Sequence, residues 1–131
     1  MSDAPASRAE VAVVHDRLRP EERMLFDAFQ RAGVTPERIY APGWRWEAGA
    51  RRHEGQVVLL RTLSHARTLA IARALEADGA HVVNPASVID TCGDKAATSA
   101  ALAAAGVPQP RTFVAFGAEQ VLDACDQLGW P

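Results

Sequence analysis

The apolar residues of this chain fall into short continuous runs, separated by longer stretches in which they recur at helical spacing. A short apolar run without alternation is typical of a strand that is buried on both faces of a parallel sheet. Each run therefore predicts a strand. The runs lie at residues 11–14, 38–41, 57–60, 81–83 and 112–115.

Helices are predicted between these strands from the residues at their ends. Pro20 begins a helix with Glu21 and Glu22 in its first turn, where acidic side chains interact favourably with the helix dipole, and Gly33 ends it. Ser64 is expected to cap a second helix. Further helices are predicted at residues 87–90, 94–105 and 118–128.

Strands that alternate with helices at this spacing indicate βαβ units around a parallel sheet. The predicted fold class is therefore α/β, with a parallel, Rossmann-like sheet flanked by helices. Residues 1–10 are mostly polar or small and predict a disordered leader. The chain stops at residues 129–131, where the alternation requires another strand, so we expect a piece of a longer protein. The alternative is that the last strand–helix unit folds back on the first domain.

Composition narrows the class of protein. A net charge of −2 with 23% charged residues gives no sign of a surface for nucleic acid or anionic membrane. The two cysteines form neither a C-x-x-C pair nor a secreted disulfide framework, and the first residues lack the apolar core of a signal peptide. We therefore expect a cytoplasmic protein. The four histidines lie on separate segments without paired ligand spacing, so they predict no metal site.

Candidate binding residues follow the strands. In open α/β sheets, ligands bind at the carboxyl ends of the strands, where Arg17, Arg19, Arg61 and Arg67 are expected. Guanidinium groups at one rim suit a carboxylate or phosphate ligand. The alternative, which spacing alone favours slightly, is that these arginines are exposed or pair with the acidic residues of segment 16–22.

The helix at residues 94–105 contains an unusual lysine. Asp94 can cap its first turn, and Gly106 followed by Pro108 ends it. Lys95 then lies in the first turn, where a cation faces the positive end of the helix dipole. Either Lys95 pairs with Asp94 or Asp90, or it holds an external anion such as a phosphate.

The sequence around this lysine resembles the start of the catalytic domain of ATP-grasp enzymes. The resemblance lies in the C-G-D-K segment at residues 92–95, a short helix, and the G-V-P-Q-P-R-T segment at residues 106–112. Residues 16–26, residues 64–67 and the segment from Val83 to Lys95 resemble one branch of that superfamily. This branch is the ligase family of lysine and arginine biosynthesis, and the resemblance extends from about residue 11 to residue 131.

The resemblance implies an ATP-dependent ligase that forms a C–N bond. Such enzymes attach 2-aminoadipate or glutamate to the C-terminal glutamate of an amino-group carrier protein through an acyl phosphate, with Mg²⁺ at the phosphates. In the family, the lysine that matches Lys95 contacts ATP phosphates. A second ATP lysine and the magnesium ligands come later than Pro131, so neither catalytic nor metal-binding residues are expected in this chain.

The resemblance also implies a division of the chain. Residues 11–91 correspond to a pre-ATP-grasp domain, and residues 92–131 to a linking helix and the start of a truncated ATP-grasp lobe. Alone, this chain is expected to be inactive. Two alternatives stay open: a glutamate ligase that modifies a ribosomal protein or small acceptor, and a non-catalytic, stand-alone α/β binding domain. The sequence does not distinguish 2-aminoadipate from glutamate, and it leaves the oligomeric state open, a homo-oligomer included.

Overall fold

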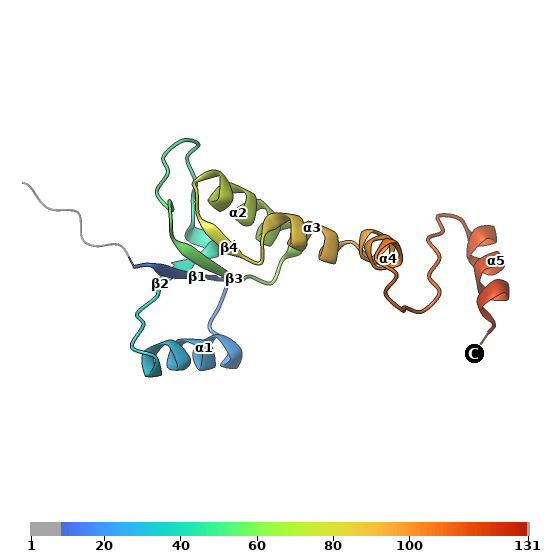
Figure 1. Cartoon of the computed structure of the whole chain (residues 1–131), viewed down its shortest axis with the longest axis horizontal. Helices are drawn as coiled ribbons and strands as arrows, with labels where there is room; N and C mark the ends of the chain where they lie inside the picture. The colour runs from blue at the N-terminus through green and yellow to red at the C-terminus, as the bar shows by residue number, and fades with distance from the viewer. Residues whose placement is uncertain (1–8, 131) are drawn as a thin grey trace, which may run out of the picture. The chain divides into compact units, whose positions relative to one another are not determined.

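The computed structural model describes residues 9–130, so only Ala9 and Glu10 of the predicted leader at residues 1–10 belong to the described part of the chain. The chain divides into two compact units (Figure 1). Unit 1 ends at Asp90, and unit 2 begins at Thr91. Helix α3 (Ala86–Gly93) contains the boundary between them.

Unit 1 is built on a four-stranded sheet. The strands lie in the order β2-β1-β3-β4, and every neighbouring pair is parallel. The predicted α/β fold with a parallel sheet is therefore confirmed, and each strand predicted for this unit is found close to its expected bounds. The strands are β1 (Val11–His15), β2 (Glu37–Tyr40), β3 (Val57–Arg61) and β4 (His81–Val83).

Helices cover both faces of this sheet. Helix α1 (Pro20–Arg31) lies on one face and α2 (His65–Ala77) on the other (Figure 1). Both helices begin where the sequence predicts. Pro20 occupies the first turn of α1, and the Ser64 hydroxyl caps α2 by accepting from the amide N of Arg67 at 3.4 Å.

The core of unit 1 lies mainly between the sheet and α2. It includes Ala12, Val14 and Val58 from the strands and Ile71 and Leu75 from α2. Val58 and Leu75 are completely buried. Each Å² of apolar surface removed from water stabilises the fold by roughly 25 cal/mol. This packing therefore holds the carboxyl ends of β1 and β3 in a fixed position.

The aromatic segment between β2 and β3 is attached to this core. It starts with a short 3-10 helix, η1 (Ala41–Gly43). The indole Nε1 of Trp46 donates to Oδ1 of the buried Asp78 at 2.9 Å, and Trp44 packs against the core cluster. The tryptophans therefore fix this long loop on unit 1.

Unit 2 contains two helices at predicted positions, α4 (Lys95–Ala104) and α5 (Ala118–Leu128). The predicted strand at residues 112–115 is wrong, because these residues form no strand. A strand is stable only when its backbone N–H and C=O groups pair with a neighbour. The described residues of unit 2 form no strand that could supply those partners.

Candidate functional site

The strand order creates a topological switch point between β1 and β3. From β1 the chain moves to β2 on one side, and later to β3 on the other side. In open α/β sheets, ligands bind outside the carboxyl ends of the strands at such a point. The segments after β1 and β3 meet there, because the amide N of Leu63 donates to Oδ2 of Asp16 at 2.7 Å.

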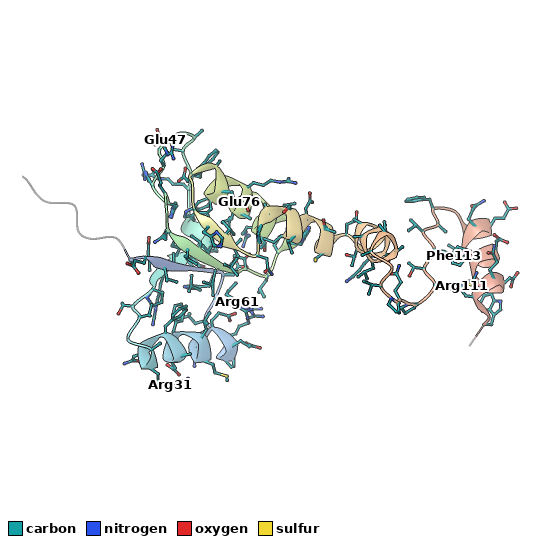
Figure 2. All side chains as sticks on the ribbon, in the orientation of Figure 1. Arg31, Glu47, Arg61, Glu76, Arg111 and Phe113 are labelled. Carbon is teal, nitrogen blue, oxygen red and sulfur yellow. The ribbon has the colours of Figure 1, made fainter. Side chains whose placement is uncertain are left out.

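The carboxylate of Glu22 is completely buried at this edge. Arg19 donates to both of its oxygens, through Nε at 2.9 Å and Nη2 at 2.7 Å, and Arg61 donates through Nε at 3.1 Å. Arg61 lies between the sheet and α1 (Figure 2). The hydrogen bonds from Arg19, supported by those from Arg61, outweigh desolvation and lower the pKa of Glu22 to about 2. This cluster fixes the start of α1 to the end of β3.

Asp16 forms a second ion pair at the same edge. Its Oδ1 accepts from Nη1 of Arg67 at 2.6 Å. The hydrogen bond from the Leu63 amide, together with the charge and hydrogen bond of Arg67, lowers the pKa of the Asp16 carboxyl. This pair joins the loop after β1 to the first turn of α2.

The structure therefore brings three of the four candidate arginines onto carboxylates. Arg19 and Arg61 contact Glu22, and Arg67 contacts Asp16. Arg17 is exposed, and its charge helps to lower the pKa of Asp16. These contacts agree with the alternative in which the arginines pair with nearby acidic residues. A role of the four arginines in substrate binding stays a prediction.

Sequence reasoning missed the burial of Glu22, because acidic residues in a first helical turn are ordinarily exposed. The available signal was its position three residues after Arg19: Oε2 of Glu22 accepts from the amide N of Arg19 at 3.1 Å, as in a capping box. His15 was also missed. It is buried at the end of β1 against the rings of Phe26 and Tyr40, and its Nδ1 has no partner in the described structure.

Lys95 is the first residue of α4, and its side chain is exposed. Asp94 caps the helix as predicted, because its Oδ1 accepts from two amides of the first turn at 2.8 and 3.0 Å. Asp90, the other partner considered for Lys95, pairs with Arg73 at 2.9 Å. Within residues 9–130, Lys95 has no ion pair. Its ammonium group is therefore available to an external anion.

Two features are absent from the described part of the chain. Residues 9–130 contain no group of three or more His, Cys, Asp and Glu side chains that could hold a metal ion. None of the helices formed by these residues combines the length and the apolar character needed to cross a membrane.

The parallel sheet and its switch-point edge define an α/β domain of the Rossmann-like class. Residues 11–91 match the family model described as the LysX preATP-grasp domain. The chain belongs to this family, which confirms the resemblance to the ATP-grasp ligases of lysine and arginine biosynthesis.

Relatives extend the likeness beyond residue 91. The chain is 31% identical over 121 residues to the glutamate–LysW ligase ArgX of Sulfurisphaera tokodaii, covering 92% of this chain and 43% of that protein. It is 28% identical over 125 residues to the α-aminoadipate–LysW ligase LysX of the same organism, covering 92% and 44%. A crystal structure described as a RimK domain protein ATP-grasp, from Sphaerobacter thermophilus, matches with a TM-score of 0.78 and 31% identity over 95% of this chain and 47% of that one. The chain thus spans less than half the length of these relatives.

Proposed function

We propose that this chain forms the N-terminal part of an ATP-dependent carboxylate–amine ligase. The ligase joins 2-aminoadipate or glutamate to the C-terminal glutamate of an amino-group carrier protein in the cytoplasm. The observation that carries the proposal is the match of residues 11–91 to the LysX preATP-grasp family. The names of the two curated relatives, both ligases acting on LysW, support it.

The proposed chemistry is formation of an amide bond at the expense of ATP. The carboxylate of the carrier is first phosphorylated, and the amino group of the amino acid then attacks the acyl phosphate, releasing phosphate. Phosphoryl transfer depends on positioning and on neutralising the charge of the phosphates. Lys95 suits the second task, because it is an exposed cation at the start of a helix and has no ion-pair partner within residues 9–130.

Mg²⁺ is expected beside ATP in this class of enzyme. Mg²⁺ is held in proteins by carboxylate oxygens together with substrate phosphates and water. Residues 9–130 contain no group of three or more His, Cys, Asp and Glu side chains that could hold a metal ion. We expect the ligands in the part of the longer relatives that this chain does not cover.

A glutamate ligase that modifies a ribosomal protein is the second candidate. The ligase family that the chain resembles is related to the ligases that add glutamate to a ribosomal protein, and a RimK domain protein ATP-grasp is 31% identical to this chain, as is the ArgX relative. The two candidates differ in acceptor and in the amino acid added. Both use ATP, so ATP consumption alone does not separate them.

The test begins with the coding sequence that follows Pro131 and continues with the complete gene product. We expect an open reading frame that leads into a strand with a second lysine. The purified full-length protein should release ADP only when LysW and one amino acid are both present, and mass spectrometry should show LysW extended by glutamate or 2-aminoadipate. Extension of a ribosomal protein instead would select the second candidate.

The 131-residue chain serves as the control. We expect it to bind ATP weakly or not at all, and to release no ADP. A stop codon directly after Pro131, or a full-length protein that modifies neither acceptor, would contradict the proposed function.

A further inference from the structure

The outer side of β2 is an open edge of the sheet. β2 is the end member of the strand order and pairs with β1. No other backbone segment among residues 9–130 hydrogen-bonds to residues 38–40. In a parallel pair, alternate residues of a strand direct their N–H and C=O groups away from the partner strand. This edge can therefore pair with another extended chain.

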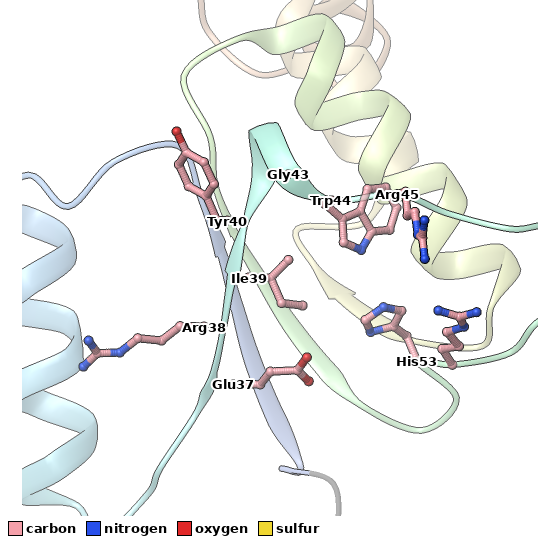
Figure 3. A pocket seen from close by; sticks show the side chains of 9 residues that line it. Glu37, Arg38, Ile39, Tyr40, Gly43, Trp44, Arg45 and His53 are labelled. Atoms are coloured by element: carbon pink, nitrogen blue, oxygen red, sulfur yellow. The ribbon is translucent and has the colours of Figure 1, made fainter.

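A hollow of about 460 Å³ opens beside β2, on the face of the sheet that α2 covers. Trp44, Arg45 and His53 come from the loop after β2 and lie together on this side of the strand, whereas Arg38 points the other way, toward α1 (Figure 3). We call this cavity the loop-side hollow. Its position next to the open edge makes it accessible to the side chains of a strand that pairs with β2.

Two exposed arginines, Arg45 and Arg52, line the loop-side hollow together with one carboxylate, that of Glu37, which accepts from Nε2 of Gln56 at 2.9 Å. Arg45 is exposed, and no carboxylate of the described chain lies within ion-pair distance of it. Arg52 approaches Glu47 at 3.4 Å, but the two side chains are 64% and 76% exposed, so this pair is weak. The His53 ring is oriented by a hydrogen bond between its Nδ1 and Oε1 of Gln56 at 2.9 Å. An acidic side chain would complement these groups.

A second hollow, of about 330 Å³, lies on the α1 side of β2. Its walls include the apolar side chains of Phe26, Val34 and Pro36 and the polar side chains of Asp27, Gln30 and Thr35. The guanidinium of Arg38 lies over the Phe26 ring, 4.1 Å from its centroid, and is thereby kept against α1. The apolar part of this wall, formed by Phe26, Val34 and Pro36, suits a small apolar side chain.

We propose that the β2 edge binds an extended, acidic peptide segment of a partner protein as an additional strand. Successive residues of a strand point to opposite faces. The bound segment would therefore direct acidic side chains into the loop-side hollow and the intervening apolar side chains into the second hollow. In this mode of recognition, main-chain hydrogen bonds supply affinity and alternate side-chain pockets supply specificity.

A second copy of this chain is a poorer occupant than an acidic peptide. If β2 of a second copy paired with this edge, its one carboxylate would be that of Glu37. This carboxylate already accepts from Nε2 of Gln56 at 2.9 Å. Pro36 and Pro42 flank the strand and limit backbone pairing to a few residues. Because such short pairing is weak, the two hollows must contribute to binding, which favours a segment with matching side chains.

The test uses the isotope-labelled 131-residue chain and the peptide acetyl-Val-Glu-Val-Glu-Val-amide. We expect the peptide to shift the amide resonances of residues 38–40 and the indole resonance of Trp44 in nuclear magnetic resonance spectra. Arg45→Glu should weaken binding about tenfold or more. The matched control is Arg23→Glu, because Arg23 is exposed on α1 and lines neither hollow, and it should leave binding unchanged.

Two altered peptides complete the experiment. Methylation of the central valine nitrogen removes a main-chain donor and should abolish the shifts if the peptide pairs with β2. Replacement of both glutamates by lysine should abolish them as well. The proposal is overturned if the acidic peptide leaves residues 38–40 unperturbed at about millimolar concentration, if the lysine peptide binds equally well, or if β2 resonances report only self-association of the chain.

Discussion

The two units differ in where their apolar residues lie. In unit 1, residues of the core cluster such as Val58 and Leu75 are completely buried. In unit 2, Ala124 is the only buried hydrophobic residue among residues 91–130, while Phe116 is 99% exposed and Trp130 is 62% exposed. Unit 1 thus has the core of an independent domain, whereas unit 2 has helices without one.

This difference shows that helices can form without a completed core. The helices α4 and α5 form from local signals, namely caps and apolar periodicity. An exposed apolar surface on the scale of that in unit 2 is typical of an interface. In the proposed full-length ligase, we expect the remainder of the ATP-grasp lobe to cover it.

The largest expected effect comes from a core substitution in unit 1. Leu75→Ala should lower the free energy of unfolding by about 3 kcal/mol, because it leaves a cavity at a completely buried position. Urea unfolding followed by circular dichroism measures this change. The matched variant in unit 2, Leu122→Ala, removes a side chain that is 55% exposed and should change stability by less than about 0.5 kcal/mol. Equal decreases in the free energy of unfolding of the two variants would contradict the claim that only unit 1 has a buried core.

Glu22→Gln should give the next largest effect. The amide leaves Arg19 and Arg61 opposite a neutral group in a buried site, and the free energy of unfolding should fall by about 2 to 3 kcal/mol. Glu21→Gln is the control, because the Glu21 side chain is 61% exposed and should contribute little. Similar values for the two variants would show that the Glu22 cluster does not stabilise unit 1.

The same cluster predicts how the stability of unit 1 depends on pH. The pKa of Glu22 is about 2 in the folded chain and 4.5 ordinarily. A carboxyl with a lowered pKa stabilises the fold fully above its unfolded pKa, and this contribution is lost as the pH falls through the folded value. The urea midpoint should therefore decrease from about pH 5 to pH 2, with a smaller decrease in Glu22→Gln. Asp16, whose pKa is also lowered, accounts for part of the remaining decrease. An unchanged pH dependence in the variant would contradict this assignment.

The smallest expected effect concerns the helix cap in unit 2. Asp94→Ala removes the acceptor for two amides of α4 and should destabilise that helix by about 1 kcal/mol. Hydrogen exchange of the α4 amides should accelerate, whereas exchange in the strands of unit 1 should not change. Asp94→Ser retains a capping oxygen and should restore most of the protection. Unchanged α4 exchange in Asp94→Ala would show that the cap is unnecessary.

Local signals allowed much of this structure to be predicted from the sequence. The strands of unit 1, the start of α1 at Pro20 and the caps Ser64 and Asp94 depend on residues close together in the chain. The strand predicted at residues 112–115 is wrong, because a strand depends on a distant pairing partner that local signals do not reveal. Burial of Glu22 was equally hidden, because it depends on Arg61, which is 39 residues away.

The candidate site was predicted less completely than the fold. Sequence placed Arg17, Arg19, Arg61 and Arg67 at the carboxyl end of the sheet, but it could not decide whether they bind a ligand or pair with Asp16 and Glu22. The structure supplies those ion pairs. Lys95 was identified from its unfavourable position relative to the helix dipole, and its binding of ATP stays a proposal.

Calorimetric titration of the full-length ligase with ATP and Mg²⁺ tests the central proposal most directly. Lys95→Ala should weaken ATP binding at least about tenfold, which corresponds to about 1.4 kcal/mol, because it removes a cation from the phosphates. Arg23→Ala is the matched loss of an exposed cation in unit 1 and should leave ATP affinity unchanged. Equal ATP affinities of Lys95→Ala and the unmodified protein would contradict the assignment of Lys95 to the nucleotide site.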